Sequence, residues 1–152
     1  MSKRREGREA AVQYLYQLEA HGDRVTDLRA DFWTLRESNP KVRAFAEQLV
    51  EGVNACLPEI DERISKYAHN FELRRLAAVD RNVLRLAIYE MLHCMETPPI
   101  VAINEAIEIA RKFGGEDSSK FVNGILDKVK CELTRPLREA TVPRPSVKAE
   151  PK

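Results

Sequence analysis

The spacing of apolar residues is the feature that most restricts the fold of this chain, because it is helical from the N-terminus to about residue 133. In the first segment, at about residues 4–20, Ala11, Leu15 and Leu18 recur at intervals of four and three and share one helix face. No stretch of useful length alternates apolar and polar residues as a half-buried strand does. The sequence therefore predicts an all-α fold.

Glycine positions and the apolar pattern divide the chain into helical segments. The segment at about residues 79–94 has apolar residues on more than one face, which predicts a central helix. The next predicted helix, at about 101–113, has Phe113 facing inward and ends at Gly114 and Gly115, since glycine adopts a left-handed turn without strain. The predicted helices begin at about residues 4, 26, 40, 58, 79, 101 and 118. We expect a compact bundle of about seven helices.

Length and composition predict one domain with a short tail. The chain of 152 residues accommodates a single domain. From Pro136 onward proline and charged residues dominate, so we expect a helical domain at 1–135 and a disordered tail at 136–152. No run approaches the roughly 18 apolar residues of a spanning helix, and no apolar signal-peptide region begins the chain, which predicts a cytoplasmic protein. The three cysteines are widely spaced, which favours reduced thiols.

Patterns typical of catalysis or metal binding are absent from the sequence. There is no glycine-rich phosphate loop, no cysteine or histidine pair at metal-ligand spacing, and no serine–histidine–aspartate candidate. The histidines, His21, His69 and His93, are scattered along the chain. The sequence predicts a protein that is not an enzyme and that holds no metal or cofactor.

A basic cluster begins the chain. Residues 1–10 carry four basic and two acidic side chains, a net +2, although the whole chain carries only +1. Because a helix N-terminus already carries about half a positive charge, exposed arginines there each cost roughly a few tenths of a kcal/mol. A bound phosphate reverses the sign, since it meets guanidinium groups, backbone N–H groups and the helix dipole together.

This cluster predicts an RNA-binding surface. On the same helix, a glutamine can hydrogen-bond a base edge and a tyrosine ring can stack on a base. The candidate residues are Lys3, Arg4, Arg5, Arg8, Gln13 and Tyr16. A frayed, solubilising basic terminus with Tyr16 in the core is the alternative that the sequence leaves open.

A second candidate is the turn at residues 114–121, which leads into a helix. Lys120 and Phe121 lie in its first turn, and a basic residue beside an aromatic one is a common nucleic-acid-binding pair. The alternative gives Asp117 and Ser118 ordinary capping roles and places Phe121 in the core.

Several runs of this sequence resemble the NusB family of transcription antitermination factors. The runs are VAINEAIEIA at 101–110, KFG at 112–114, SKFVNGILD at 119–127, REAAVQYLY at 8–16 and VLRLAIYE at 83–90. The resemblance covers about residues 3–133.

The resemblance implies an all-helical, NusB-like fold of two packed subdomains and an RNA-binding function. Family members pair with ribosomal protein S10, also called NusE, bind single-stranded boxA RNA, and act on the RNA polymerase elongation complex with other Nus factors. They suppress termination, notably in ribosomal RNA operons. The resemblance also implies that both candidate groups form one RNA surface, and that Asp80, Arg81 and Asp117 contact S10. Homodimerisation without S10 stays open.

Two departures from the family pattern and two alternative functions remain. Gly7 interrupts the basic run, which predicts a looser arm because glycine costs about 1 kcal/mol of helix propensity relative to alanine. Residues 21–39 match the family poorly. The alternatives are an accessory RNA-binding domain of the ribosomal RNA methyltransferase type and a helical scaffold that binds protein alone.

Overall fold

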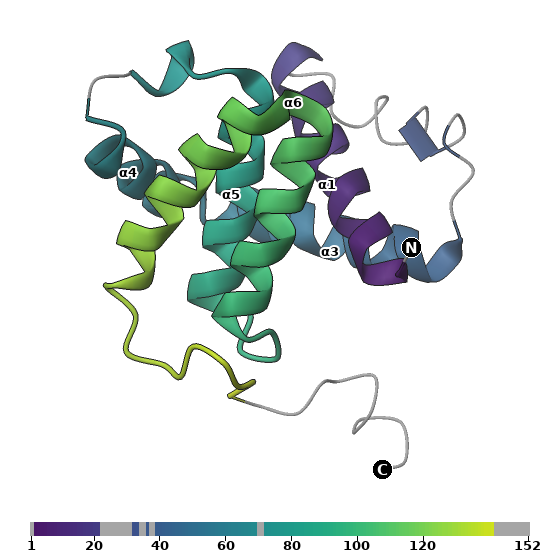
Figure 1. The fold of residues 1–152 in the computed structure, drawn as a ribbon. Helices are drawn as coiled ribbons and strands as arrows, with labels where there is room; N and C mark the ends of the chain where they lie inside the picture. Colours follow the sequence, from purple (N-terminus) through teal and green to yellow (C-terminus); the bar gives the residue numbers. More distant parts are fainter. Residues whose placement is uncertain (1, 22–31, 34–35, 37–38, 70–71, 142–152) are drawn as a thin grey trace. The chain divides into compact units, whose positions relative to one another are not determined.

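The computed structural model describes residues 2–21, 32–33, 36, 39–69 and 72–141, and these residues form helices joined by turns. The α-helices and the single 3₁₀ helix (η1) are α1 (Lys3–His21), α3 (Pro40–Ala55), α4 (Leu57–Tyr67), η1 (Leu73–Arg75), α5 (Ala78–His93) and α6 (Pro99–Lys130), as Figure 1 shows. No strand occurs within the described ranges. The prediction of an all-α fold is confirmed. Within the same ranges, no helix combines the length and apolarity needed to cross a membrane.

The described residues hold five α-helices, fewer than the seven predicted from the sequence. One reason is that α6 contains two of the predicted helices, joined at Gly115, whose backbone is not helical (φ 89°, ψ −173°). Only glycine adopts this conformation readily, and a Cβ there would meet no atom within 4 Å, so the constraint is the backbone itself. The predicted turn at Gly114–Gly115 is therefore present as a corner within α6 (Figure 1). The helix predicted from residue 26 falls largely outside the described residues.

The chain divides into two compact units, residues Met1–Cys56 (unit 1) and Leu57–Lys152 (unit 2). In unit 1, α1 packs against α3 through small and branched apolar side chains. Gly7 lies where the two helices approach, because a Cβ at this position would come 2.5 Å from Cδ2 of Phe45. The glycine that interrupts the basic run thus has a packing role, and Gly7 is itself buried. The close approach of α1 and α3 at Gly7 argues against the looser basic arm that helix propensity predicts.

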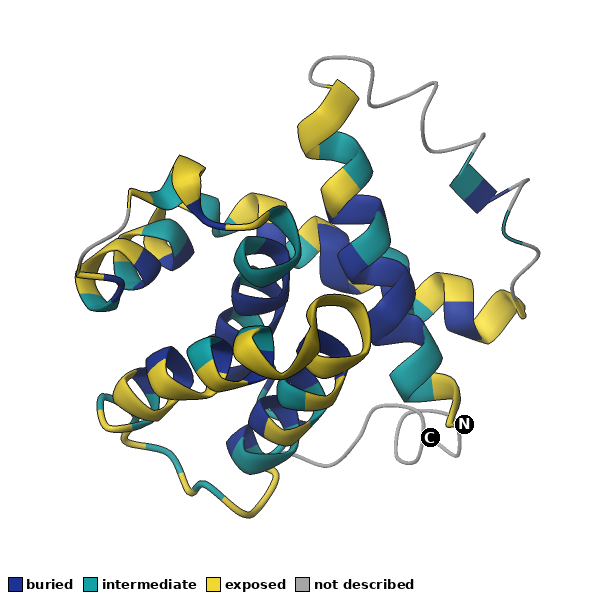
Figure 2. Ribbon diagram, turned by 45° about the horizontal axis from the view of Figure 1, so that its top comes forward, coloured by how far each residue is buried: buried dark blue, intermediate teal, exposed yellow. Residues whose placement is uncertain are grey.

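In unit 2, α5 is the central helix, as predicted from its apolar residues on several faces. It contacts both α4 and α6, and its buried residues include Leu84, Ile88 and Met91, each fully enclosed. Figure 2 shows the buried residues along the inner faces of the helices, while the corner of α6 is exposed throughout.

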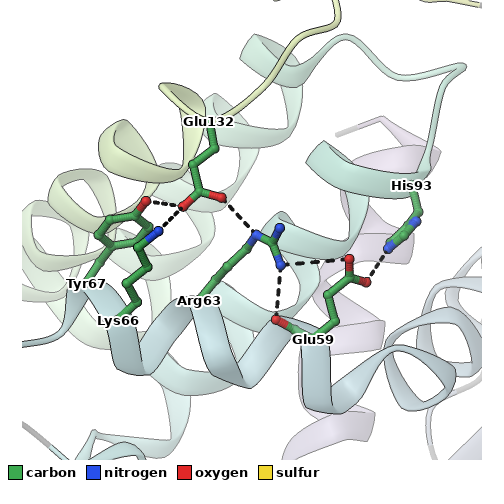
Figure 3. A network of polar contacts seen from close by, with 6 residues as sticks. All are labelled: Glu59, Arg63, Lys66, Tyr67, His93 and Glu132. Atoms are coloured by element: carbon green, nitrogen blue, oxygen red, sulfur yellow. Dashed lines mark hydrogen bonds and ion pairs between the residues drawn. The ribbon is translucent and has the colours of Figure 1, made fainter.

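Polar contacts tie α4 to its neighbours in unit 2. Arg85 of α5 donates two hydrogen bonds to Asp61 of α4, at 2.9 and 3.1 Å. Glu132, just after α6, accepts hydrogen bonds from Tyr67, Arg63 and Lys66 of α4, and Glu59 pairs with His93 at 2.7 Å (Figure 3). The hydroxyl of Tyr67, followed by the positive charges of Lys66 and Arg63, holds the pKa of Glu132 below its ordinary value.

Arg135 closes the turn between α5 and α6. Its guanidinium donates to four backbone carbonyls, those of Met91, Cys94, Met95 and Thr97, at 2.6–3.3 Å. Burial lowers the pKa of Arg135.

Residues after Arg135 also form hydrogen bonds near the α5–α6 turn, through their backbone. The Ile100 amide donates to the Leu137 carbonyl, and the Thr141 amide donates to the Met95 carbonyl. Leu137 and Thr141, in the stretch predicted to be disordered, are thus hydrogen-bonded to the start of α6 and to the α5–α6 turn. Residues 142–152 lie outside the described residues.

Candidate nucleic-acid interface

The first two turns of α1 hold the basic cluster, and Ser2 caps the helix. The Ser2 hydroxyl accepts a hydrogen bond from the Arg5 amide at 3.0 Å, and its carbonyl accepts one from the Glu6 amide. The alternative of a frayed terminus is wrong for these residues, because the helix begins at Lys3 with a side-chain cap.

The basic side chains of α1 differ in their exposure. Lys3 is exposed and Arg5 is half-buried, whereas Arg8 is only 3% exposed. The guanidinium carbons of Arg4 and Arg8 lie 4.1 and 5.5 Å from the ring centroid of Phe45, on α3. A cation over an aromatic face is stabilised by the ring quadrupole, so these two arginines also contribute to the packing of α1 on α3. Sequence periodicity within α1 carries no information about this contact, because Phe45 belongs to another helix.

Stacking leaves the charge of the guanidinium in place. The ring contacts the flat face of the group, while its N–H donors lie in the plane and point outward from the edge. A stacked arginine that a phosphate can reach is already oriented, which lowers the cost of ordering it on binding. Arg8, at 3% exposure, is not such a residue in this structure.

Tyr16 and Gln13 lie further along α1. Tyr16 is 48% exposed, so the alternative that places it in the core is wrong. Tyr14 is the buried tyrosine and stacks on Phe32, with ring centroids 4.9 Å apart and planes inclined by 12°. Gln13 is half-buried, and its side-chain oxygen accepts a hydrogen bond from Arg36.

The second candidate group lies at the corner of α6 in unit 2. Lys120 is exposed and Phe121 is half-buried, on the arm that follows Gly115. Phe113, predicted to face inward, is 36% exposed, and the Lys112 ammonium lies 5.5 Å from its ring centroid. The prediction for Phe113 is wrong because the chain turns beside it, so no further helical turn covers the ring. In the sequence, the two glycines directly after Phe113 are the signal that the helix turns there and leaves the ring exposed.

The three residues predicted to contact S10 differ in their position and in their contacts. Asp80 lies in the first turn of α5, where a negative charge suits the helix dipole, and Asp117 is exposed beside the α6 corner. Arg81 donates to the carbonyls of Leu73 and Leu76, at 3.1 and 2.8 Å. Arg81 therefore fixes the η1 turn, which is a structural role.

The structure groups the predicted RNA-binding residues into two sets, one in each unit. The α1 set comprises Lys3, Arg4, Arg5, Arg8, Gln13 and Tyr16, and the α6 set comprises Lys120 and Phe121. The exposed aromatic–cation pair at Phe113 and Lys112 adjoins the α6 set in sequence.

Residues 5–130 match the family model for the NusB family. The chain belongs to the NusB family. It is 44% identical over 140 residues to the transcription antitermination protein NusB of Myxococcus xanthus (strain DK1622), covering 90% of this chain and 100% of that one. It is 43% identical over 135 residues to the protein of the same name from Sorangium cellulosum (strain So ce56), covering 89% and 96%.

Solved structures of NusB proteins have a similar fold. The structure of T. maritima NusB is 40% identical in sequence, with a TM-score of 0.76, and the match covers 89% of this chain and 94% of that one. A crystal structure of antitermination factors NusB and NusE in complex with double-stranded RNA contains a chain that is 26% identical, with a TM-score of 0.78 over 88% and 99% of the two chains.

Proposed function

We propose that this NusB-family chain is a transcription antitermination factor that binds boxA-type single-stranded RNA together with ribosomal protein S10 (NusE). By joining the RNA polymerase elongation complex with other Nus factors, the pair suppresses termination, notably in ribosomal RNA operons. The chain acts by binding, without catalysis, in the cytoplasm where the transcript is made.

The observation that carries the proposal is the basic start of α1. Lys3 and Arg5 lie beside a helix N-terminus whose dipole favours anions, and Arg4 is stacked on Phe45. This arrangement concentrates positive charge on residues that the fold also holds in place. A strand of phosphates is the ligand that such a surface fits best.

The remaining proposed contacts involve aromatic rings that are exposed or half-buried. Tyr16, and Phe113 with Phe121, supply aromatic surface for base stacking, and Lys120 adds positive charge. Asp80, Arg81 and Asp117 are proposed to contact NusE. Support for both partners comes from the related NusB chain that was crystallised with NusE and RNA.

The decisive experiment is a titration of boxA-like RNA with and without NusE. NusE should tighten binding, and a scrambled strand should bind more weakly. A duplex of the same sequence is included because the related complex holds double-stranded RNA. The proposal fails if NusE has no effect on affinity, and preference for the duplex would overturn the single-stranded target.

Charge reversal tests the surface itself. K3E/R5E changes one exposed and one half-buried residue and keeps Arg4 and Arg8, the two arginines that lie over Phe45. Circular dichroism of the variant shows whether the fold is retained. We expect RNA affinity to fall about tenfold or more, since charge-assisted hydrogen bonds are among the stronger ones. The salt slope should flatten by roughly 0.7 per lost phosphate contact. K41E/K128E, the same change of charge at two exposed lysines elsewhere, is the matched control and should bind RNA normally.

Two assays separate the alternatives. Saturable binding of a methyl donor would favour the methyltransferase-type accessory role. A scaffold that binds only protein should keep NusE and its function in the K3E/R5E variant.

A further inference from the structure

Arg36 is joined to Gln13, one of the residues proposed to meet the RNA. One terminal nitrogen of its guanidinium (Nη1) donates a hydrogen bond to the side-chain oxygen (Oε1) of Gln13. Both residues belong to unit 1, Arg36 from the stretch between α1 and α3 and Gln13 from α1. The contact is partly buried and bridges residues far apart in the sequence.

An aromatic cluster holds Arg36 in place. Its guanidinium carbon lies 6.0 Å from the Phe32 ring centroid, and Phe32 stacks on Tyr14 of α1. Trp33, which is buried, meets Phe32 edge to face, with centroids 4.9 Å apart. Arg36 thus lies over a ring that stacks on the same helix as Gln13, which limits how far the guanidinium can move.

The chemistry of the pair fixes the orientation of the Gln13 amide. A guanidinium has five N–H donors and no acceptor, so only the amide oxygen can face it. This holds irrespective of how the oxygen and nitrogen of the amide are assigned. A flip of the amide would place two donors against each other and would lose a charge-assisted hydrogen bond. The NH₂ group therefore occupies the end of the amide that is turned away from Arg36.

We propose that Arg36 determines base specificity by holding Gln13 as a hydrogen-bond donor toward the RNA; this rests on the function proposed above. A free glutamine pairs best with adenine, since it accepts from N6 and donates to N7. When Arg36 engages the oxygen, the NH₂ group selects an acceptor. Guanine and uracil carry a keto oxygen where adenine and cytosine carry an amino group. Where the NH₂ group meets this position of the base, it favours the keto oxygen of G or U over the amino group of A or C, and adenine loses the bidentate pair that needs the Gln13 oxygen.

The test is base discrimination at single positions. A boxA-like strand, and variants with each nucleotide replaced in turn by the other three, are titrated into the protein with NusE present. The wild type should prefer G or U at one position by about 2- to 10-fold, the range of a single hydrogen bond. R36M should abolish that base preference and leave the base preference at every other position unchanged. R36K, whose ammonium can also donate to the oxygen, should restore part of it.

A double-mutant cycle shows whether Arg36 acts through Gln13. Q13A alone should level the same position, and adding R36M to Q13A should have no further effect. The matched control is R43M, because Arg43 also lies over a ring of this cluster, 5.4 Å from the Trp33 centroid, but pairs with Glu47. R43M should keep the base preference. Thermal unfolding of each variant shows whether the fold is retained.

The outcomes separate this proposal from the function on which it rests. Failure of the wild type to bind RNA would overturn the function. Binding by the wild type without a G or U preference at any position, or retention of that preference in R36M, would overturn the role of Arg36 alone. Loss of the G or U preference in R43M as well as in R36M would also overturn the role of Arg36. The effect would then come from a disturbed aromatic cluster.

Discussion

The two units use arginine in different ways. In unit 1, the guanidinium groups of Arg4, Arg8 and Arg36 lie over aromatic rings, and Arg43 combines a ring contact with an ion pair. In unit 2, three arginines with part-buried contacts have the N–H edge bonded to oxygen. Arg85 donates to a carboxylate, and Arg81 and Arg135 donate to backbone carbonyls.

The difference separates arginines that hold the fold from arginines suited to a ligand. A carboxylate neutralises a guanidinium and occupies its donors, whereas a ring contacts its face without cancelling its charge. The stacked arginines of unit 1 can therefore be packed and still contribute positive potential. We expect substitutions of these arginines in unit 2 to act mainly on stability, and substitutions of basic residues at the surface of unit 1 to act mainly on RNA binding.

The largest expected effect on stability is at Arg135. R135A removes the guanidinium donor from four carbonyls at the end of α5 and in the α5–α6 turn, and two of them, those of Cys94 and Met95, keep backbone amide donors. We expect the free energy of unfolding to fall by about 2–4 kcal/mol. Urea denaturation followed by far-UV circular dichroism measures this change. R135K keeps the charge but not the planar fork, and should lie between R135A and the wild type.

Two further measurements on R135A test whether its effect is confined to unit 2. Trp33 is the only tryptophan and lies in unit 1, so its fluorescence shows whether unit 1 is still folded in the variant. RNA affinity of folded R135A should stay within about twofold of the wild type, a change of less than half a kcal/mol. A loss of stability below about 0.5 kcal/mol, the usual range of neutral surface substitutions, would show that Arg135 is dispensable to unit 2.

A smaller effect on stability is expected at Gly7, and the sign of the change distinguishes helix propensity from packing. Helix propensity alone predicts that G7A stabilises α1 by about 1 kcal/mol. The added Cβ would lie 2.5 Å from Phe45, so we expect destabilisation of about 1–3 kcal/mol instead. In an F45A background the clash is gone, and G7A should become neutral or stabilising. Thermal unfolding of the four proteins gives the result, and a stabilised G7A single variant would contradict the close approach of α1 and α3.

The smallest effect concerns Glu132 and pH. The Tyr67 hydroxyl, with Lys66 and Arg63, lowers the pKa of Glu132 from its ordinary value of 4.5, so the folded state favours the carboxylate. This contribution is complete above pH 4.5 and is lost as the pH falls through the lower pKa of the folded protein. The wild type should therefore exceed E132Q in urea midpoint at neutral pH, and the gap should shrink toward pH 3. An equal gap at both pH values would exclude the carboxylate as its source.

Periodicity predicted the helices but could not choose between the two tyrosines of α1. Tyr14 and Tyr16 flank Leu15 and lie about 100° to either side of it, so both border the apolar stripe equally. The contact between Tyr14 and Phe32 decides which ring is buried, and it depends on tertiary packing. The same limit applies to Arg8, whose burial depends on Phe45.

Composition correctly marked the chain after residue 135 as poor in apolar groups, yet it could not reveal contacts made by the backbone. Leu137 and Thr141 are held through a backbone carbonyl and a backbone amide, which every sequence possesses. The glycine corner of α6 was predictable, because its cause is the local conformation of Gly115. The residues that bind RNA and NusE remain predictions until the variants are measured.

The position of Arg135 in the sequence has a consequence for the order in which the molecule matures during synthesis. The carbonyls that it binds precede it by 38 to 44 residues. At about 5 to 20 residues per second, a ribosome takes about 2 to 9 s to cover that interval. During this time unit 1 has every residue it needs, whereas the α5–α6 turn still waits for its closing side chain. A nascent chain stalled before residue 135 would therefore carry the finished basic helix on an incompletely locked second unit.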